Sequence, residues 1–174
     1  MEYELRKATT GILIQEVFET ENLNHCKLFV YLGTQIYNFK QSIEQIAWYL
    51  NMPVKAVNYS LSFLLKKGYI YKFGTGYDTL INSYNIKDFY YFPVNIKKLK
   101  KLNSFAELKL YRILVKNMEH DYRINIDKIW KFDFCQTIEY DIIENMIQYL
   151  EQIGMIEIFE LSDRLVYNLI YDID

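Results

Sequence analysis

The chain has 174 residues, of which 51% are hydrophobic and 24% charged, and its formal net charge is −2. This length suits one domain or two small ones, and the apolar fraction is enough for a sizeable core. No apolar run reaches the ~18 residues that a membrane span needs, and the N-terminus has early acidic residues in place of an apolar signal core. We therefore expect a soluble, cytoplasmic protein with no membrane partner.

Charge is distributed unevenly along the chain. Residues 38–75 hold five lysines and one glutamate, a balance of +4. Residues 119–174 hold four Lys and Arg and thirteen Asp and Glu, a balance of −9. One part of the chain is therefore suited to face phosphates, whereas the other should repel them.

The first forty residues predict helices. The first twenty contain the apolar runs Ile12–Ile14 and Val17–Phe18, which fit a short strand or a buried helical turn, and we favour a helix. Residues 22–37 predict a clearer helix, because apolar residues recur there at helical spacing and Asn22 or Asn24 can cap it. The recurring residues are Leu28, Tyr31, Leu32 and Ile36.

Residues 42–84 predict a helix, a tight turn, a second helix and a two-stranded hairpin. Ser42 and Gln45 have the spacing of a capping box, in which each side chain satisfies one backbone amide. Asn51, Met52 and Pro53 end the first helix, and Pro53 suits the first turn of the second, which Gly68 ends. The apolar residues of the inner faces are Ile43, Ile46, Ala47 and Leu50 in the first helix and Val54, Val57, Leu61 and Leu64 in the second.

The hairpin follows directly. Residues 69–73 are strand-like, residues 74–76 are a turn signal, and residues 77–84 can return as the partner strand. This order resembles the winged helix-turn-helix domains of bacterial, phage and plasmid regulators and replication proteins. The resemblance covers about a quarter of the chain and is carried by Ile43, Ile46, Ala47, Leu50, Val57, Leu61, Leu64, Gly68, Tyr69 and Ile70. It implies a fold in which the small Ala47 lets the two helices pack closely, and it says much less about function.

Residues 85–103 connect two halves of the chain. Residues 88–93 are aromatic and end in proline, which favours an extended conformation. Four lysines then surround Leu99, at positions 97, 98, 100 and 101. This cluster is either a solvated helix face or a contact for a nucleic-acid backbone, and the sequence leaves both open.

The pattern begins again at Ser104. Ser104 and Glu107 have the spacing of another capping box, and a helix continues from there to Met118. Residues 120–123 predict a loop, and residues 126–130 a short helix that Asn125 can cap. A long helix should cover residues 137–152 and end at Gly154, before strands at residues 155–161 and 165–171.

The two halves match each other at fixed offsets. Residues 25–29 correspond to residues 107–111, and the later positions correspond at an offset of 86. The later matches pair Leu64, Gly68, Ile70, Leu80 and Asn82 with Leu150, Gly154, Ile156, Val166 and Asn168. We therefore predict an α+β, mainly α, fold with two tandem winged helix-turn-helix domains, at residues 1–90 and 91–174. The tandem arrangement resembles plasmid and phage replication initiators, and the helical extension resembles DnaD-like replisome organisers.

The second copy departs from the DNA-binding pattern. Trp130 stands where the first copy has Ala47, so its helices should pack less closely. Its second helix carries Glu139, Asp141, Glu144 and Glu151 and no Lys or Arg. Those carboxylates would face phosphates unpaired in a major groove. We therefore expect this degenerate domain to make a protein contact or to serve as scaffold.

The candidate DNA-binding residues lie on the helix Pro53–Lys66 and on the hairpin. They are Lys55, Asn58, Tyr59, Ser62, Lys66, Lys67 and Lys72. Asn can bond adenine in bidentate fashion, Lys can reach guanine or phosphate, and Tyr and Ser can reach phosphate or a thymine methyl. The last three lysines are suited to backbone contacts. The alternative interpretation is an ordinary solvated helix face.

Catalytic and metal-binding patterns are not visible in the sequence. The only histidines are His25 and His120, and there is no phosphate-binding glycine loop, nucleophile elbow or carboxylate pair. Cys26 and Cys135 lie far apart, without the spacing of a zinc site or a disulfide framework, and are expected in the core of a protein from a reducing compartment. We expect no enzyme activity, metal or cofactor.

The sequence thus favours a sequence-specific double-stranded DNA-binding protein, either a transcriptional regulator or a replication initiation factor. The helix Pro53–Lys66 would enter the major groove. A homodimer reading a palindrome is the expected geometry, with the aromatic residues 84–92 as its interface. The alternative is a non-enzymatic interaction or adaptor protein, or a phage-type inhibitor, whose acidic C-terminal half docks a basic partner.

Overall fold

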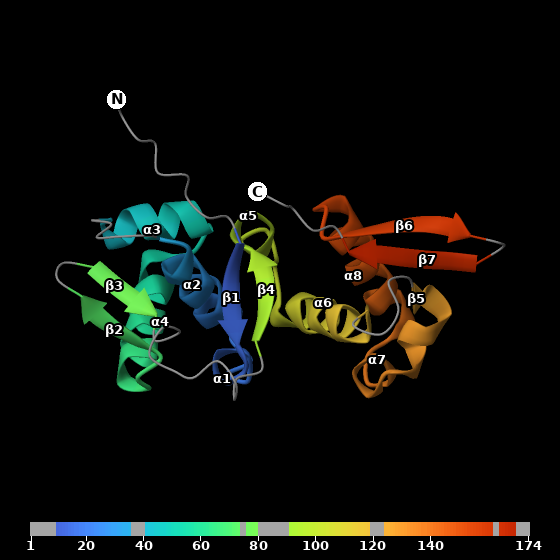
Figure 1. Cartoon of the computed structure of the whole chain (residues 1–174), viewed down its shortest axis with the longest axis horizontal. Helices are drawn as coiled ribbons and strands as arrows, with labels where there is room; N and C mark the ends of the chain where they lie inside the picture. The colour runs from blue at the N-terminus through green and yellow to red at the C-terminus, as the bar shows by residue number, and fades with distance from the viewer. Residues whose placement is uncertain are drawn as a thin grey trace, which may run out of the picture. The chain divides into compact units, whose positions relative to one another are not determined.

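The computed structural model describes residues 10–35, 41–73, 76–79, 91–118, 124–161 and 164–169. In these ranges the chain is mainly helical with small antiparallel sheets, as predicted (Figure 1). It divides into two compact units, residues 1–101 with residue 174 and residues 102–173. Residues 91–101, which we had assigned to the second domain, lie in unit 1 because strand β4 (Tyr91–Asn95) pairs antiparallel with strand β1 (Thr10–Ile14).

Strand β1 replaces part of the helix expected at the start of the chain. That prediction is wrong for residues 10–14, and only the short helix α1 (Gln15–Phe18) follows them. The strand lies close to helix α2 (Leu23–Thr34) at Gly11, where an added Cβ would be 2.8 Å from Cγ1 and 2.9 Å from the carbonyl oxygen of Val30. Glycine is therefore required here for the close approach. Residues 1–9 are outside the described ranges.

Helix α2 is the central helix of unit 1. It packs against β1 on one side and against helix α4 (Val54–Lys66) on the other (Figure 1). The Oδ1 atom of Asn22 caps it by accepting hydrogen bonds from the amides of Asn24, at 2.9 Å, and His25, at 3.3 Å. The predicted cap is thus confirmed, and the helix ends at Thr34. Residues 36 and 37 are outside the described ranges.

The predicted helix, turn, helix and hairpin are present in unit 1, and residues 80–84 of the predicted second strand are outside the described ranges. Helix α3 (Ile43–Leu50) begins with the expected capping box, in which the Ser42 amide donates to Oε1 of Gln45 at 2.9 Å and the Gln45 amide donates to Oγ of Ser42 at 3.2 Å. After α4, Gly68 has a φ of +73°, and the chain continues into β2 (Ile70–Phe73) and β3 (Gly76–Thr79). Helix α5 (Ile96–Leu99) follows β4.

Unit 2 has a similar order of helices and strands, but the segment between its first and last helices is different. Helix α6 (Phe105–Met118) has a second capping box, and strand β5 (Ile124–Asn125) leads into the 3-10 helix η3 (Ile126–Lys131) and helix α7 (Asp133–Gln136). Helix α8 (Tyr140–Gln152) begins three residues later than predicted, because Glu139 is extended with a ψ of 142°. Strands β6 (Ile156–Leu161) and β7 (Arg164–Leu169) form a sheet in the order β5-β7-β6.

The backbone geometry of α4 and α8 is the same. Each helix has 13 residues, with residue 54 corresponding to residue 140, and each is followed by a glycine of positive φ, +73° at Gly68 and +75° at Gly154. The residue after each glycine donates its amide to the carbonyl five residues earlier. These bonds join Tyr69 to Leu64 and Met155 to Leu150, both at 2.9 Å. Both helices therefore end in the same Schellman-type turn.

Candidate nucleic-acid interface

The outer face of α4 holds four of the seven candidate residues. Val57, Leu61 and Leu64 point into the core of unit 1. Lys55, Asn58, Tyr59 and Ser62 are all exposed. Asn58, Tyr59 and Ser62 follow Lys55 by three, four and seven residues, so the four share one side of the helix. Val54, expected in the inner stripe, is instead 40% exposed beside them, because it is the first helical residue and lies at the edge of the core.

The remaining three candidates are lysines at the end of α4 and on the hairpin. Lys66 is the last residue of α4, Lys67 is its C-cap and Lys72 lies in β2, and all three are exposed. The Nζ atom of Lys67 is 5.9 Å from the centre of the Phe63 ring. Positive charge at a helix C-terminus is favourable for the helix dipole, so Lys66 and Lys67 are suited to the end of α4.

The lysine cluster at residues 97–101 belongs to the same unit. The Nζ atom of Lys100 lies 4.2 Å from the ring centre of Tyr49 on α3, and its carbonyl accepts a hydrogen bond from the buried Lys27 of α2 at 3.0 Å. Residues 1–101 hold 13 Lys and Arg against 8 Asp and Glu, a balance of +5, whereas residues 102–174 hold 7 against 14, a balance of −7. The charge asymmetry of the chain therefore follows the division into two units.

A buried histidine supports the outer face of α4 from below. His25 on α2 is 3% exposed and stacks on Phe63, with ring centres 4.2 Å apart, and on Tyr59, at 5.7 Å. Its Nδ1 lies 3.3 Å from Oγ1 of Thr20, and that hydroxyl donates to the Val17 carbonyl at 2.7 Å. The hydroxyl proton is thus already engaged, so the imidazole Nδ1–H is the donor to Thr20.

Burial disfavours the charged form of this histidine. Its Nε2 is buried with no hydrogen-bond partner among the described residues, and desolvation by burial lowers the pKa of His25 below its ordinary value of 6.5. We had considered His25 only for catalysis. The structure instead gives it a positioning role between α2 and the candidate residue Tyr59.

Trp48 is an exposed residue that the sequence analysis missed. It lies on α3 next to the buried Ala47 and is 84% exposed. Exposure of an indole ring to water costs free energy, and exposed aromatic residues are frequent on contact surfaces. The sequence did indicate that Trp48 is exposed, because it does not belong to the apolar stripe formed by Ile46, Ala47 and Leu50.

The equivalent surface of unit 2 has different chemistry. The exposed residues of α8 and its N-cap include Glu139, Asp141, Glu144 and Glu151, and the helix has no Lys or Arg. Trp130, predicted to hinder close packing, stands in a 3-10 helix and stacks on Tyr140 with ring centres 4.1 Å apart. The surface of α8 is thus acidic where that of α4 is basic.

Other kinds of site lack support within the described ranges. No group of three or more His, Cys, Asp and Glu that could hold a metal is found there. Cys26 and Cys135 are free and buried, and burial raises the pKa of Cys26 to about 12, so both are core residues as predicted. None of the described helices has the length and apolarity to cross a membrane. His120 and residues 84–90 are outside the described ranges.

Comparisons with known proteins give no match. No protein-family model, curated protein or solved structure matches the chain significantly. The functional argument therefore depends on the residues and geometry described above.

Proposed function

We propose that the protein binds double-stranded DNA in a sequence-specific manner, with α4 in the major groove. One observation carries the proposal: all seven candidate residues are exposed on α4, its C-cap and strand β2. These elements belong to the unit with a balance of +5. DNA-binding domains commonly combine a local basic surface with a helix that fits the major groove.

The element order supports a winged helix for each unit. Helices α2, α3 and α4 followed by the β2–β3 hairpin have the order of that fold, with α4 as recognition helix and the hairpin as wing. In unit 2, the sheet order β5-β7-β6 places the strand that follows α6 next to the last strand of the hairpin. The matching turns after α4 and α8 support a tandem pair.

The proposed contacts divide by chemistry. Asn58 and Lys55 would read base edges, because amide and ammonium groups match the donor and acceptor pattern of the major groove. Lys66, Lys67 and Lys72 would bind phosphates and add no sequence preference. Under this proposal the protein acts as a transcriptional regulator or a replication initiation factor, and the DNA site would distinguish these roles by its position near promoters or an origin.

A binding selection tests the proposal. Purified protein is mixed with fragmented bacterial and phage DNA, and bound fragments are sequenced after washes at low and high salt. Enrichment of one short motif that survives high salt is expected, and an inverted repeat would indicate two copies per site. Uniform recovery that disappears with salt would indicate phosphate contacts alone, and no recovery would contradict the proposal.

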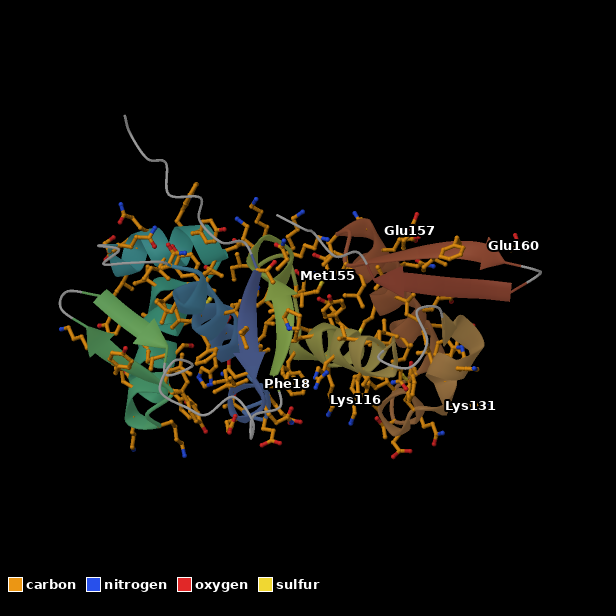
Figure 2. All side chains as sticks on the ribbon, in the orientation of Figure 1. Phe18, Lys116, Lys131, Met155, Glu157 and Glu160 are labelled. Carbon is orange, nitrogen blue, oxygen red and sulfur yellow. The ribbon has the colours of Figure 1, made fainter. Side chains whose placement is uncertain are left out.

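Charge reversal provides the matched control. Lys55→Glu with Lys67→Glu should abolish recovery, because it places two acids against phosphates. Lys116→Glu with Lys131→Glu makes the same change in charge at two exposed lysines of unit 2 (Figure 2) and should leave recovery unchanged. Equal loss in both pairs would indicate a nonspecific effect of net charge.

A second candidate function has one observation in its favour. The exposed face of α8 carries acidic residues and no base, which suits a protein-interaction module, an adaptor or a phage-type inhibitor that docks a basic partner. Absence of DNA recovery together with an intact fold would favour this candidate.

A further inference from the structure

Large exposed apolar side chains are confined to a few helices. Among the described residues they are Trp48, Val54, Tyr59, Leu65, Tyr140 and Ile142. Five of these six lie on α4 or α8, the two helices that correspond to each other in the repeat. Aromatic and apolar residues grouped on an exposed helix are typical of contact surfaces. Both helices therefore have an apolar component that burial against a partner would stabilise.

The charges of the two helices are complementary. At the 86-residue offset, Lys55 corresponds to Asp141 and Asn58 to Glu144. The exposed face of α4, with its C-cap, carries Lys55, Lys66 and Lys67 and no acid. The exposed face of α8, with its N-cap, carries Glu139, Asp141, Glu144 and Glu151 and no base. A surface complementary to α8 is thus present on the chain itself.

The spacing of the charges also matches. At a rise of 1.5 Å per residue, Lys55 and Lys66 are about 16 Å apart along α4, and Asp141 and Glu151 are about 15 Å apart along α8. An antiparallel arrangement of the two helices brings Lys66 to Asp141 and Lys55 to Glu151.

We propose that α8 of one copy of this chain docks antiparallel on α4 of a second copy. Each copy has both faces, so the proposed dimer contains two such contacts related by a two-fold axis. In this dimer the carboxylates of α8 lie where DNA phosphates would lie, so a second copy and DNA compete for α4. The docking itself stands without DNA binding, and only the competition rests on the proposed function.

Sedimentation equilibrium of the full chain tests the docking. The average mass should rise from monomer to dimer with concentration and return to monomer in high salt, because exposed charge pairs are screened. Two variants each reverse one member of the proposed Lys66–Asp141 pair: Lys66→Glu on α4, and Asp141→Lys on α8. Glu151 is left unchanged because its Oε1 accepts a hydrogen bond from the Ile158 amide. Each variant alone should dimerise at least tenfold more weakly.

Mixing the two variants is the decisive step. In the mixture the reversed residue 66 of one copy meets the reversed residue 141 of the other, and the second contact keeps its original Lys66–Asp141 pair. An equimolar mixture should therefore restore the dimer to within about threefold of the wild type. Glu157→Lys with Glu160→Lys, on the exposed acids of β6 (Figure 2), is the control and should dimerise like the wild type. Circular dichroism checks that each variant is folded.

The outcomes separate this proposal from DNA binding. A wild-type chain that stays monomeric at all concentrations, or a mixture that stays monomeric, would overturn the docking. A contact within one chain would also overturn it, because mixing could not restore such a contact between variants. If the DNA selection fails while mixing restores the dimer, the docking stands and the proposed function falls. If the selection recovers a DNA site while the wild-type chain stays monomeric, the proposed function stands and the docking falls.

Discussion

Helices α4 and α8 carry similar residues at their buried positions and different residues at their exposed positions. Val57, Leu61 and Leu64 of α4 correspond to Ile143, Ile147 and Leu150 of α8, and all six are buried. At the exposed positions α4 carries lysines and α8 carries acids. The comparison teaches that the inner stripe and the glycine turn specify the fold, whereas the outer positions are free to specify the partner.

The largest expected effect tests the shared inner face. Leu64 and Leu150 are each 0% exposed at corresponding positions, so Leu64→Ala and Leu150→Ala should each cost about 2–5 kcal/mol of unfolding free energy through lost burial and a cavity. Hydrogen exchange measured by mass spectrometry after brief labelling reports each unit separately. Each substitution should loosen only its own unit. Loosening of both units by one substitution would show that they unfold together.

The next prediction concerns the two glycines. Gly68 and Gly154 have φ values of +73° and +75°, a region that L-residues occupy at a cost of about 1–2 kcal/mol. Gly68→Ala and Gly154→Ala should therefore destabilise their units by similar amounts, measured by urea unfolding of each variant. A difference of more than about 1 kcal/mol between them would contradict the equivalence of the two turns.

Local signals made this part of the fold predictable. The capping boxes at Ser42 and Ser104 and the glycine at 68 act within a few residues, and their predicted roles match the hydrogen bonds and the dihedral angle. Pro53, predicted in the first turn of the second helix, is instead the extended N-cap of α4. The repeat was visible because both copies keep the same inner stripe and turn.

Long-range contacts explain what the sequence did not reveal. Strand β1 was taken for a helix because its partner β4 lies far along the chain, and the role of Gly11 depends on its contact with Val30. The exposed Trp48 was overlooked because aromatic residues are usually assumed to be buried. The stack of His25 on Phe63 required the packing of α2 on α4, which no local pattern indicates.

The smallest expected effect is a change in the stability of unit 1 with pH. It distinguishes the two units, because the responsible residue is present in unit 1 alone. His25 supports α4, whereas the corresponding residue of unit 2 is Glu107, whose carboxylate accepts hydrogen bonds from the amides of Asn103, at 2.8 Å, and Ser104. Because burial lowers the pKa of folded His25 below 6.5, the unfolded chain binds this proton first as the pH falls. Its contribution to the stability of unit 1 is full above pH 6.5 and is lost as the pH falls through the lowered pKa.

Substitution of the histidine isolates this contribution. His25→Phe keeps an aromatic ring for the stack and removes the titration, so the fall in the unfolding free energy of unit 1 between pH 7.5 and pH 5 should become smaller. Urea unfolding at a series of pH values measures it. An identical pH dependence in the variant and the wild type would show that His25 is not the group responsible.

The most direct test of the central claim compares one pair of corresponding residues. Asn58 on α4 and Glu144 on α8 occupy the same exposed position at the 86-residue offset. Fluorescence anisotropy at one salt concentration would measure the affinity of Asn58→Ala and Glu144→Ala for the DNA site recovered in the selection. We expect Asn58→Ala to lose about 1–3 kcal/mol of binding free energy and to relax the sequence preference at one base pair, while Glu144→Ala binds at least as tightly as the wild type. Equal affinities for Asn58→Ala and the wild type, or a loss confined to Glu144→Ala, would contradict the assignment of DNA binding to α4.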